Sequence, residues 1–257
     1  MEETAPGGLG LAILICRLFF GAVDCGDHPA PGMPVTDLPP TPECAGTIPW
    51  YELVLEADGE ALDDQDAATI EDRLTQPGVC RLVVHPEGAG SIRLGIATAD
   101  NPLDLVQPAL NPGVLSFHRV VDDLPPGAPV GPDQMALASM DDDGRAMIVE
   151  IEPLLEGQAI ESADAAIAQH GGWAITVRFT DKGRERFGDI TTDLLGRRLA
   201  IVLDRQVMSA PYIQEPIIGG SAMISGSFDE AQARLLAAIL NSDPLPPGVH
   251  VVSIEMP

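Results

Sequence analysis

The sequence predicts an α+β protein made of two blocks, and three observations support this class. Short apolar runs alternate between faces as half-buried strands do, amphipathic stripes at helical spacing lie between some of them, and segments rich in proline and glycine divide the chain. The 257 residues suffice for two modest domains, and a hydrophobic content of 45% excludes wholesale disorder. We therefore expect helices packed on mixed sheets.

The first block, residues 50–123, follows a β-α-β-β-α-β order. Ala67, Ile70 and Leu74 form the apolar stripe of a helix, which is ended by the segment 76–78. A poorer helix, interrupted by two prolines, is predicted at 101–110. This order is typical of a ferredoxin-like split βαβ unit. Its strands are predicted at 50–55, 80–84, 92–97 and 114–121.

The second block, residues 135–257, follows a proline- and glycine-rich segment at 124–134 that we predict to be a hinge linker. The block itself is predicted to be a mixed-sheet α+β unit. The sequence leaves open whether its last strand returns to the sheet of the first block. Its strands are predicted at 146–151, 173–179, 198–203, 207–210 and 249–254.

Three helices are predicted in the second block. A short one is expected at 160–168 and another ends near Leu195. The terminal helix is strongly amphipathic, and Ser227 with Glu230 fits a capping box at its start. Its apolar side carries Ala231, Leu235, Leu236, Ile239 and Leu240.

The charge of the chain restricts its partners. Fourteen basic against 39 acidic residues give a formal charge of −25, which repels phosphate backbones and anionic lipid headgroups. We therefore expect no nucleic-acid binding, and membrane contact only through the N-terminal segment. A solvated acidic surface is a better interpretation of this charge than an acidic ligand-binding face.

The sequence carries no pattern typical of an enzyme. The five histidines are scattered, and the chain contains neither a G-x-S-x-G elbow nor a phosphate-binding loop. Residues 141–144, Asp-Asp-Asp-Gly, lack the distal glutamate of a calcium loop and are better interpreted as an acidic turn. We predict no catalytic residues, no cofactor and no metal.

Residues 198–228 carry the most specific pattern in the chain. RLAIVLD, then V-x-SAP, then EPI-x-GGSA-x-ISGSF resembles the first extracytoplasmic domain of SecD, a membrane protein of the bacterial export machinery. Glu152 to Leu155 and Phe179 to Gly183 extend the resemblance, which in weaker form covers about residues 50–255. Ile218 departs from it, because the family more often has threonine there. The resemblance implies a base followed by a head, no enzymatic activity, and a role with exported, unfolded polypeptide and membrane export subunits.

The same motif supplies the candidate site. The glycines can permit a tight crossing of strands, or they can serve a head that grips polypeptide, and structural need outweighs direct contact. In the functional interpretation, residues 211–218 form an exposed flap, and edge strands offer unpaired amides to an added chain. The candidate binding or hinge residues are Tyr212, Ile213, Ile217, Gly219, Gly220 and Gly226.

The N-terminal region is predicted to direct export. Residues 1–23 form an apolar segment, a signal or an anchor, and residues 24–49 form a proline-rich linker. Arg17 interrupts the apolar run, and Glu2 and Glu3 stand where an export signal has basic residues. Because the following chain resembles an extracytoplasmic domain, we expect a periplasmic or cell-envelope location, and cleavage of the segment stays open.

Four cysteines leave two alternatives. Cys16 lies in the apolar segment, and a Cys25–Cys44 disulfide across the linker is reasonable in an oxidising compartment. The other alternative is a buried Cys80 with two unpaired linker thiols.

Two functional hypotheses follow. The first is a non-enzymatic extracytoplasmic module that binds exported polypeptide or assists translocation. The second is an envelope structural or adaptor protein that kept the fold without binding substrate.

Overall fold

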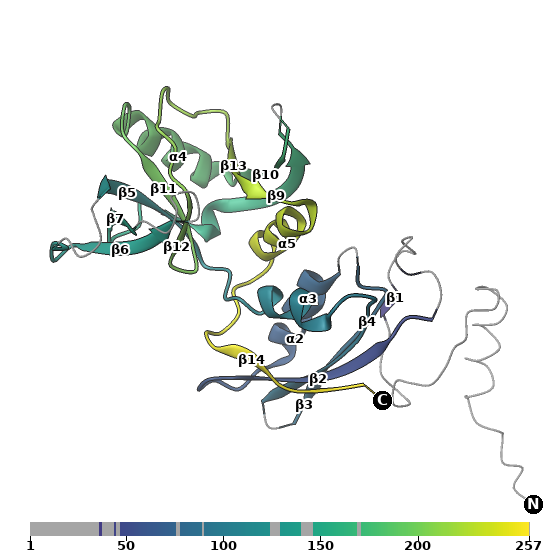
Figure 1. Cartoon of the computed structure of the whole chain (residues 1–257). Coiled ribbons are helices and arrows are strands. Elements are labelled where there is room, and N and C mark those ends of the chain that lie inside the picture. Colours follow the sequence, from purple (N-terminus) through teal and green to yellow (C-terminus); the bar gives the residue numbers. More distant parts are fainter. Residues whose placement is uncertain are drawn as a thin grey trace, which may run out of the picture.

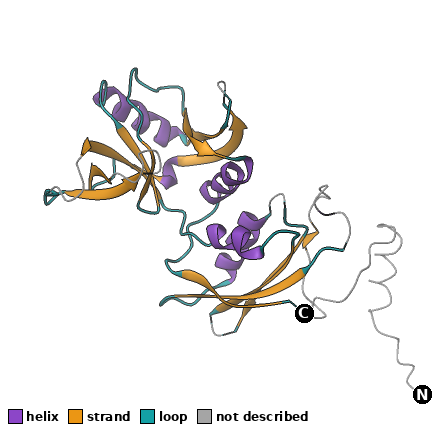
Figure 2. Cartoon of the chain, viewed as in Figure 1, coloured by secondary structure: helices purple, strands orange, loops and turns teal. Residues whose placement is uncertain are grey.

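The computed structural model describes residues 36–37, 44, 47–75, 78–88, 90–123, 129–139, 146–168 and 171–256. Helices and strands are mixed throughout, in three sheets (Figures 1 and 2). The predicted α+β class is confirmed. The predictions for residues 1–23, for Cys25 and for the acidic turn at 141–144 lie outside the described ranges.

One sheet, with two helices on one face, forms what we call the base. Its strand order is β1-β3-β4-β2-β14, and all neighbours are antiparallel. Leu53, Ile70 and Leu94 are fully buried between this sheet and the helices. The elements are β1 (Thr36–Asp37), β2 (Trp50–Ala57), α2 (Asp64–Leu74), β3 (Arg81–Glu87), β4 (Ser91–Ala97), α3 (Pro102–Ala109) and β14 (Val249–Glu255).

Local signals explain where the base helices start. Asp63 caps α2 and accepts from the N–H groups of Gln65 and Asp66, while the Asp66 carboxylate accepts from the Asp63 N–H. Asn101 caps α3, and Pro102 stands in its first turn, where an N–H would have no helical partner. Pro102, one of the two prolines that made this helix look poor in the sequence, is therefore well placed, whereas Pro108 lies inside the helix.

The predicted fourth strand of the base was assigned to the wrong sheet. Residues 115–123 do form a strand, β5 (Leu115–Asp123), but it pairs with β7, β8 and β11 of another sheet. The fourth strand is β14, from the C-terminal end of the chain, which pairs with β2. Alternation along a strand fixes which face is buried but not which sheet the strand joins.

The second sheet lies in what we call the head, the part of the chain from β5 to α5. Its order is β11-β12-β6-β7-β5-β8, and an additional β11–β5 pairing closes five of these strands into a ring. Met147, Val149 and Val207 pack inside this ring. Because β5 and β6 lie in one sheet, residues 124–134 connect two strands of the head. The new elements are β6 (Gln134–Ser139), β7 (Ala146–Glu150), β8 (Leu155–Glu156), β11 (Leu199–Leu203) and β12 (Gln206–Ser209).

The third sheet, order β13-β10-β9, completes the head with two helices. Phe117, Phe179 and Phe187 lie at the centre of the apolar core that joins it to the ring. The terminal helix starts two residues later than predicted, because its capping box consists of Asp229 and Gln232 and not of Ser227 and Glu230. The elements are η2 (Gly157–Ala159), β9 (Ile160–Ile167), β10 (Trp173–Phe179), α4 (Asp181–Asp193), β13 (Ser221–Phe228) and α5 (Glu230–Asn241).

The helix predicted at 160–168 is wrong, because these residues form β9. Their alanines favour a helix by intrinsic propensity, but propensity is a weak prior that tertiary contacts override. Here Ala163 and Ala165 pack against the head core on one face of the strand, and β10 pairs along its length.

The disulfide joins Cys44 to Cys80, so the predicted Cys25–Cys44 bridge is wrong. The two Cα atoms are 5.4 Å apart. Thr36 lies opposite Leu82 in the β1–β3 ladder, so residues 36–37 lie beside β3, the strand that Cys80 precedes. Sequence distance concealed this proximity, since 36 positions separate the paired cysteines.

A buried arginine ties base to head where the chain passes between them. Arg73 of α2 is fully buried, and it contacts both the segment after α3, which leads into the head, and the segment after α5, which returns from it. Burial lowers its pKa to about 10, although Asp204 of the head opposes this shift. Its guanidinium donates to the carbonyls of Ala109, Asn111, Pro112 and Asp243 and to the Ser242 hydroxyl.

Candidate functional site

The candidate flap, residues 211–218, lies in the connection between β12 and β13 and runs along α4 (Figure 1). At one end, the Gly196 N–H donates to the Ile213 carbonyl at 2.8 Å. Further along, the Ile217 N–H donates to Thr191 Oγ1 of α4 at 2.9 Å. The main chain of the flap is therefore anchored to the helix, and its outward side chains form a surface.

The predicted contact residues differ in their exposure. Tyr212 is 66% exposed, with its ring 5.8 Å from the Arg198 guanidinium carbon. Ile213 is only 3% exposed and belongs to the head core, so its side chain is not on the surface. Ile217 is half-buried and packs against that core. Ile218, which the sequence singled out only as a departure from the family, is 74% exposed.

The structure explains why two of the three candidate glycine positions cannot easily hold a larger residue. Gly220 has a φ of +78°, and a Cβ there would lie 2.8 Å from Arg184 Cδ. Gly226 lies in a bulge of β13, where a Cβ would lie 2.8 Å from the Phe228 ring. Gly219 has an ordinary φ and open space around its Cα, and nothing in the structure explains it.

Exposed apolar side chains occur along the flap and on the elements beside it. Met223, on β13, is 50% exposed, and Leu195 lies exposed just beyond α4. Together with Tyr212 and Ile218 they give this part of the head a mixed, partly apolar surface. Such side chains can contact an unfolded polypeptide without needing a deep pocket.

The other side of α4 borders an acidic hollow. This open depression has a volume of about 410 Å³ and contains Glu152, Glu156 and Arg186. Across the described ranges, no three His, Cys, Asp or Glu side chains are grouped to hold a metal ion. Within the same ranges, every helix is too short or too polar to cross a bilayer.

Comparison with known proteins places the head in a family. Residues 134–247 match the family described as "SecDF, P1 head subdomain". The chain is 32% identical over 202 residues to the protein translocase subunit SecD of Rhodobacter capsulatus, covering 76% of this chain and 36% of that protein. It is also 32% identical over 223 residues to the protein translocase subunit SecDF of Thermus thermophilus, covering 79% and 29%. The chain thus spans about a third of the length of these curated relatives.

Solved structures share the fold. A SecDF crystal structure in a "Super-membrane-facing form" superposes with a TM-score of 0.61 at 24% identity, over 88% of this chain and 32% of that chain. A second, described as "a membrane component SecDF that enhances protein export", gives a TM-score of 0.56 at 24% identity, over 79% and 99%. The chain therefore belongs, with residues 134–247 as its P1 head subdomain, to the family of SecD and SecDF first periplasmic domains.

Proposed function

We propose that this chain is a non-enzymatic, extracytoplasmic module that binds exported polypeptide and assists its translocation. The observation that carries the proposal is the P1 head match, which covers the flap and its neighbouring strands. Relatives described as protein translocase subunits support a role in export. No cofactor enters the proposal, and membrane export subunits are its expected partners.

The disulfide supports the extracytoplasmic location. Cys44 and Cys80 are paired, and such bonds persist in oxidising compartments but are rare in the reducing cytosol. The disulfide supports this location independently of the resemblance to the family.

We further propose that the base is a ferredoxin-like unit completed by β14. The antiparallel sheet order β14-β2-β4-β3 supports this assignment. Along the chain, β2, α2, β3, β4 and α3 supply the first five elements of the β-α-β-β-α-β unit, and β14 supplies the sixth after the head. In this division the head is an insertion between α3 and β14. A hinge between the two parts is then expected at the two crossings near Arg73 and not at residues 124–134.

A crosslinking experiment tests polypeptide binding. A photoreactive amino acid replaces Tyr212, and the purified chain is mixed with a reduced, alkylated secretory protein that cannot fold. The matched control carries the same group at Asp72, an exposed position on α2 of the base. We expect several-fold stronger labelling from position 212. Equal labelling from both positions contradicts the proposal and favours the envelope adaptor hypothesis.

A further inference from the structure

The two sheets of the head differ in whether their edge strands are paired. The ring closure between β11 and β5 removes the terminal edges that an open sheet of those strands would have. The three-stranded sheet stays open and ends in β9 on one side and β13 on the other. Unpaired strand edges are templates for an additional strand, so these two edges require an explanation.

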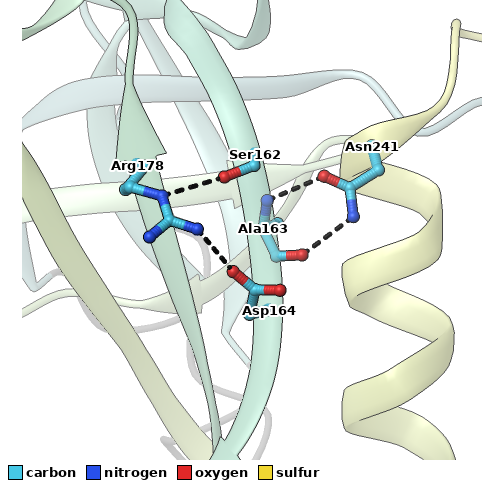
Figure 3. A network of polar contacts seen from close by, with 5 residues as sticks. All are labelled: Ser162, Ala163, Asp164, Arg178 and Asn241. Carbon is cyan, nitrogen blue, oxygen red and sulfur yellow. Dashed lines mark hydrogen bonds and ion pairs between the residues drawn. The ribbon is translucent and has the colours of Figure 1, made fainter.

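The β9 edge is blocked by the chain itself. The Asn241 amide at the end of α5 donates from Nδ2 to the Ala163 carbonyl at 2.8 Å, and its Oδ1 accepts from the Ala163 N–H at 2.7 Å (Figure 3). This side chain therefore takes the place of a peptide group on a neighbouring strand. On the same strand, Ser162 and Asp164 accept hydrogen bonds from Arg178 of β10.

One contact shows which residues of β13 form main-chain hydrogen bonds with β10. The Phe179 N–H donates to the Gly220 carbonyl at 2.9 Å. Hydrogen-bonded and non-hydrogen-bonded pairs alternate in an antiparallel ladder. With the observed register, Ala222 and Ile224 are therefore the residues whose main chain bonds to β10.

The intervening residues direct their main-chain groups away from β10. Ser221, Met223 and Ser225 are these residues, and their side chains are exposed. No hydrogen bond joins this side of the strand to another described residue. The bulge at Gly226 ends the regular stretch. The open edge thus comprises residues 221–225, directly after the flap.

We propose that residues 221–225 bind an extended segment of unfolded polypeptide by β-strand addition, an inference that rests on the proposed function and specifies its binding mode. Main-chain hydrogen bonds give such a site tolerance of many sequences, and alternate side chains add a preference. Side chains of an added strand that fall beside Ala222 and Ile224 lie at the rim of the head core, where Ile217 packs. A segment with apolar residues at every second position is therefore the preferred ligand.

A second copy of this chain fits the same edge less well. Each copy carries a formal charge of −25, and like charges repel on approach. The same charge favours a neutral or basic polypeptide. A suitable probe is a fluorescent peptide of alternating valine and threonine with two lysines at each end. Its matched control has the same side chains but N-methylated central residues, which cannot donate main-chain hydrogen bonds.

Binding is measured with the full chain by fluorescence anisotropy, together with residue-resolved amide hydrogen exchange. We expect the peptide to slow exchange at Ser221 and Met223 by about tenfold or more, because their outward N–H groups gain partners. Exchange at Ala222 and Ile224 should change little, since these amides already bond to β10. The N-methylated peptide should bind at least about tenfold more weakly.

A pair of variants tests whether the outward N–H of Met223 contributes to peptide binding. Met223→Pro removes the outward N–H without removing a bond to β10, since proline is tolerated where a strand N–H faces solvent. Met223→Thr keeps that N–H and removes the exposed side chain. We expect the proline variant to lose about tenfold in affinity and the threonine variant to change by less than about threefold. Slow exchange at Ala222 and Ile224 shows that the sheet is intact in each variant.

The outcomes separate this inference from the proposed function. Peptide binding with unchanged exchange at Ser221 and Met223 overturns strand addition and leaves polypeptide binding in place. Protection that grows with protein concentration in the absence of peptide identifies a second copy as the occupant and also overturns the inference. Absence of binding by both peptides counts against the inference and the proposed function together.

Discussion

The base and the head are stabilised in different ways. The head comes from one continuous stretch, β5 to α5, and its core is apolar, with three phenylalanine rings in mutual contact. The base collects β1 and β14 from distant parts of the chain and has the disulfide and the buried Arg73 as its ties. Closing long loops costs conformational entropy. The head therefore depends mainly on packing, and the base on bonds that hold remote segments in place.

The largest effect is expected from the centre of the head core. Phe187 lies 4.4 Å from Phe179 and 5.6 Å from Phe117 between ring centroids. Phe187→Ala should lower the free energy of unfolding by about 3–5 kcal/mol, through lost burial and a cavity. Amide exchange should accelerate in β10 and stay nearly unchanged in β4. Leu195→Ala, an exposed site after the same helix, is the control, and a comparable loss there would contradict this account.

The disulfide should contribute the next largest effect, and this effect should fall on the base. Cys80→Ser should cost about 2–4 kcal/mol, because it releases a loop whose ends are 36 positions apart. Denaturant unfolding with exchange read out in β3 and β4 measures it. Cys44→Ser and the double variant should give the same loss, since both remove one bond. A similar loss in Cys25→Ser alone would indicate another pairing.

Arg73 tests whether polar ties join the base to the head. Arg73→Met keeps much of the side-chain volume but leaves buried carbonyls without their charged donor. We expect a loss of about 2–3 kcal/mol in unfolding free energy. X-ray scattering should detect a larger radius of gyration if base and head separate. Asp72→Met, on the exposed side of the same helix, is the matched control. An unchanged radius of gyration together with an unchanged unfolding free energy would show that Arg73 does not hold the base and the head together.

Local patterns predicted most of the elements but not their assembly. The helix predicted to end near Leu195 is α4, which Thr180 caps and which buries Phe187. The strands predicted at 198–203 and 207–210 are β11 and β12, and Asp204 and Arg205 between them have the positive φ that two-residue hairpins require. The sheet joined by β5, the ring closure and the partner of Cys80 depend on contacts between distant residues. No local pattern encodes such contacts.

The exposure of the candidate site residues was predictable only in part. The motif at 198–228 contains the candidate flap, and Tyr212 in it is exposed. Alternation could not distinguish Ile213, which is buried, from Ile218, which is exposed, because an irregular flap has no fixed period. The open edge of β13 was beyond sequence reasoning, since it depends on which strands pair in the three-stranded sheet. The role of Arg73 was hidden because an arginine on a helix is ordinarily expected at the surface.

The smallest predicted effect concerns the head side of the junction. The Asp204 carboxylate accepts from the N–H groups of Gly113 (2.9 Å) and Val114 (2.8 Å), in the segment that Arg73 holds from the base. Asp204→Asn keeps a residue that tolerates its φ of 48° but replaces Oδ2, which lies 3.1 Å from the Gly113 nitrogen, with a donor that faces this N–H group. We expect a loss of about 1 kcal/mol in unfolding free energy, with faster exchange at Val114. Arg205→Lys, in the same turn with an exposed side chain, should change neither. If Asp204→Asn also leaves the unfolding free energy and the exchange at Val114 unchanged, Asp204 does not stabilise the junction, and Arg73 of the base stabilises it without a contribution from Asp204.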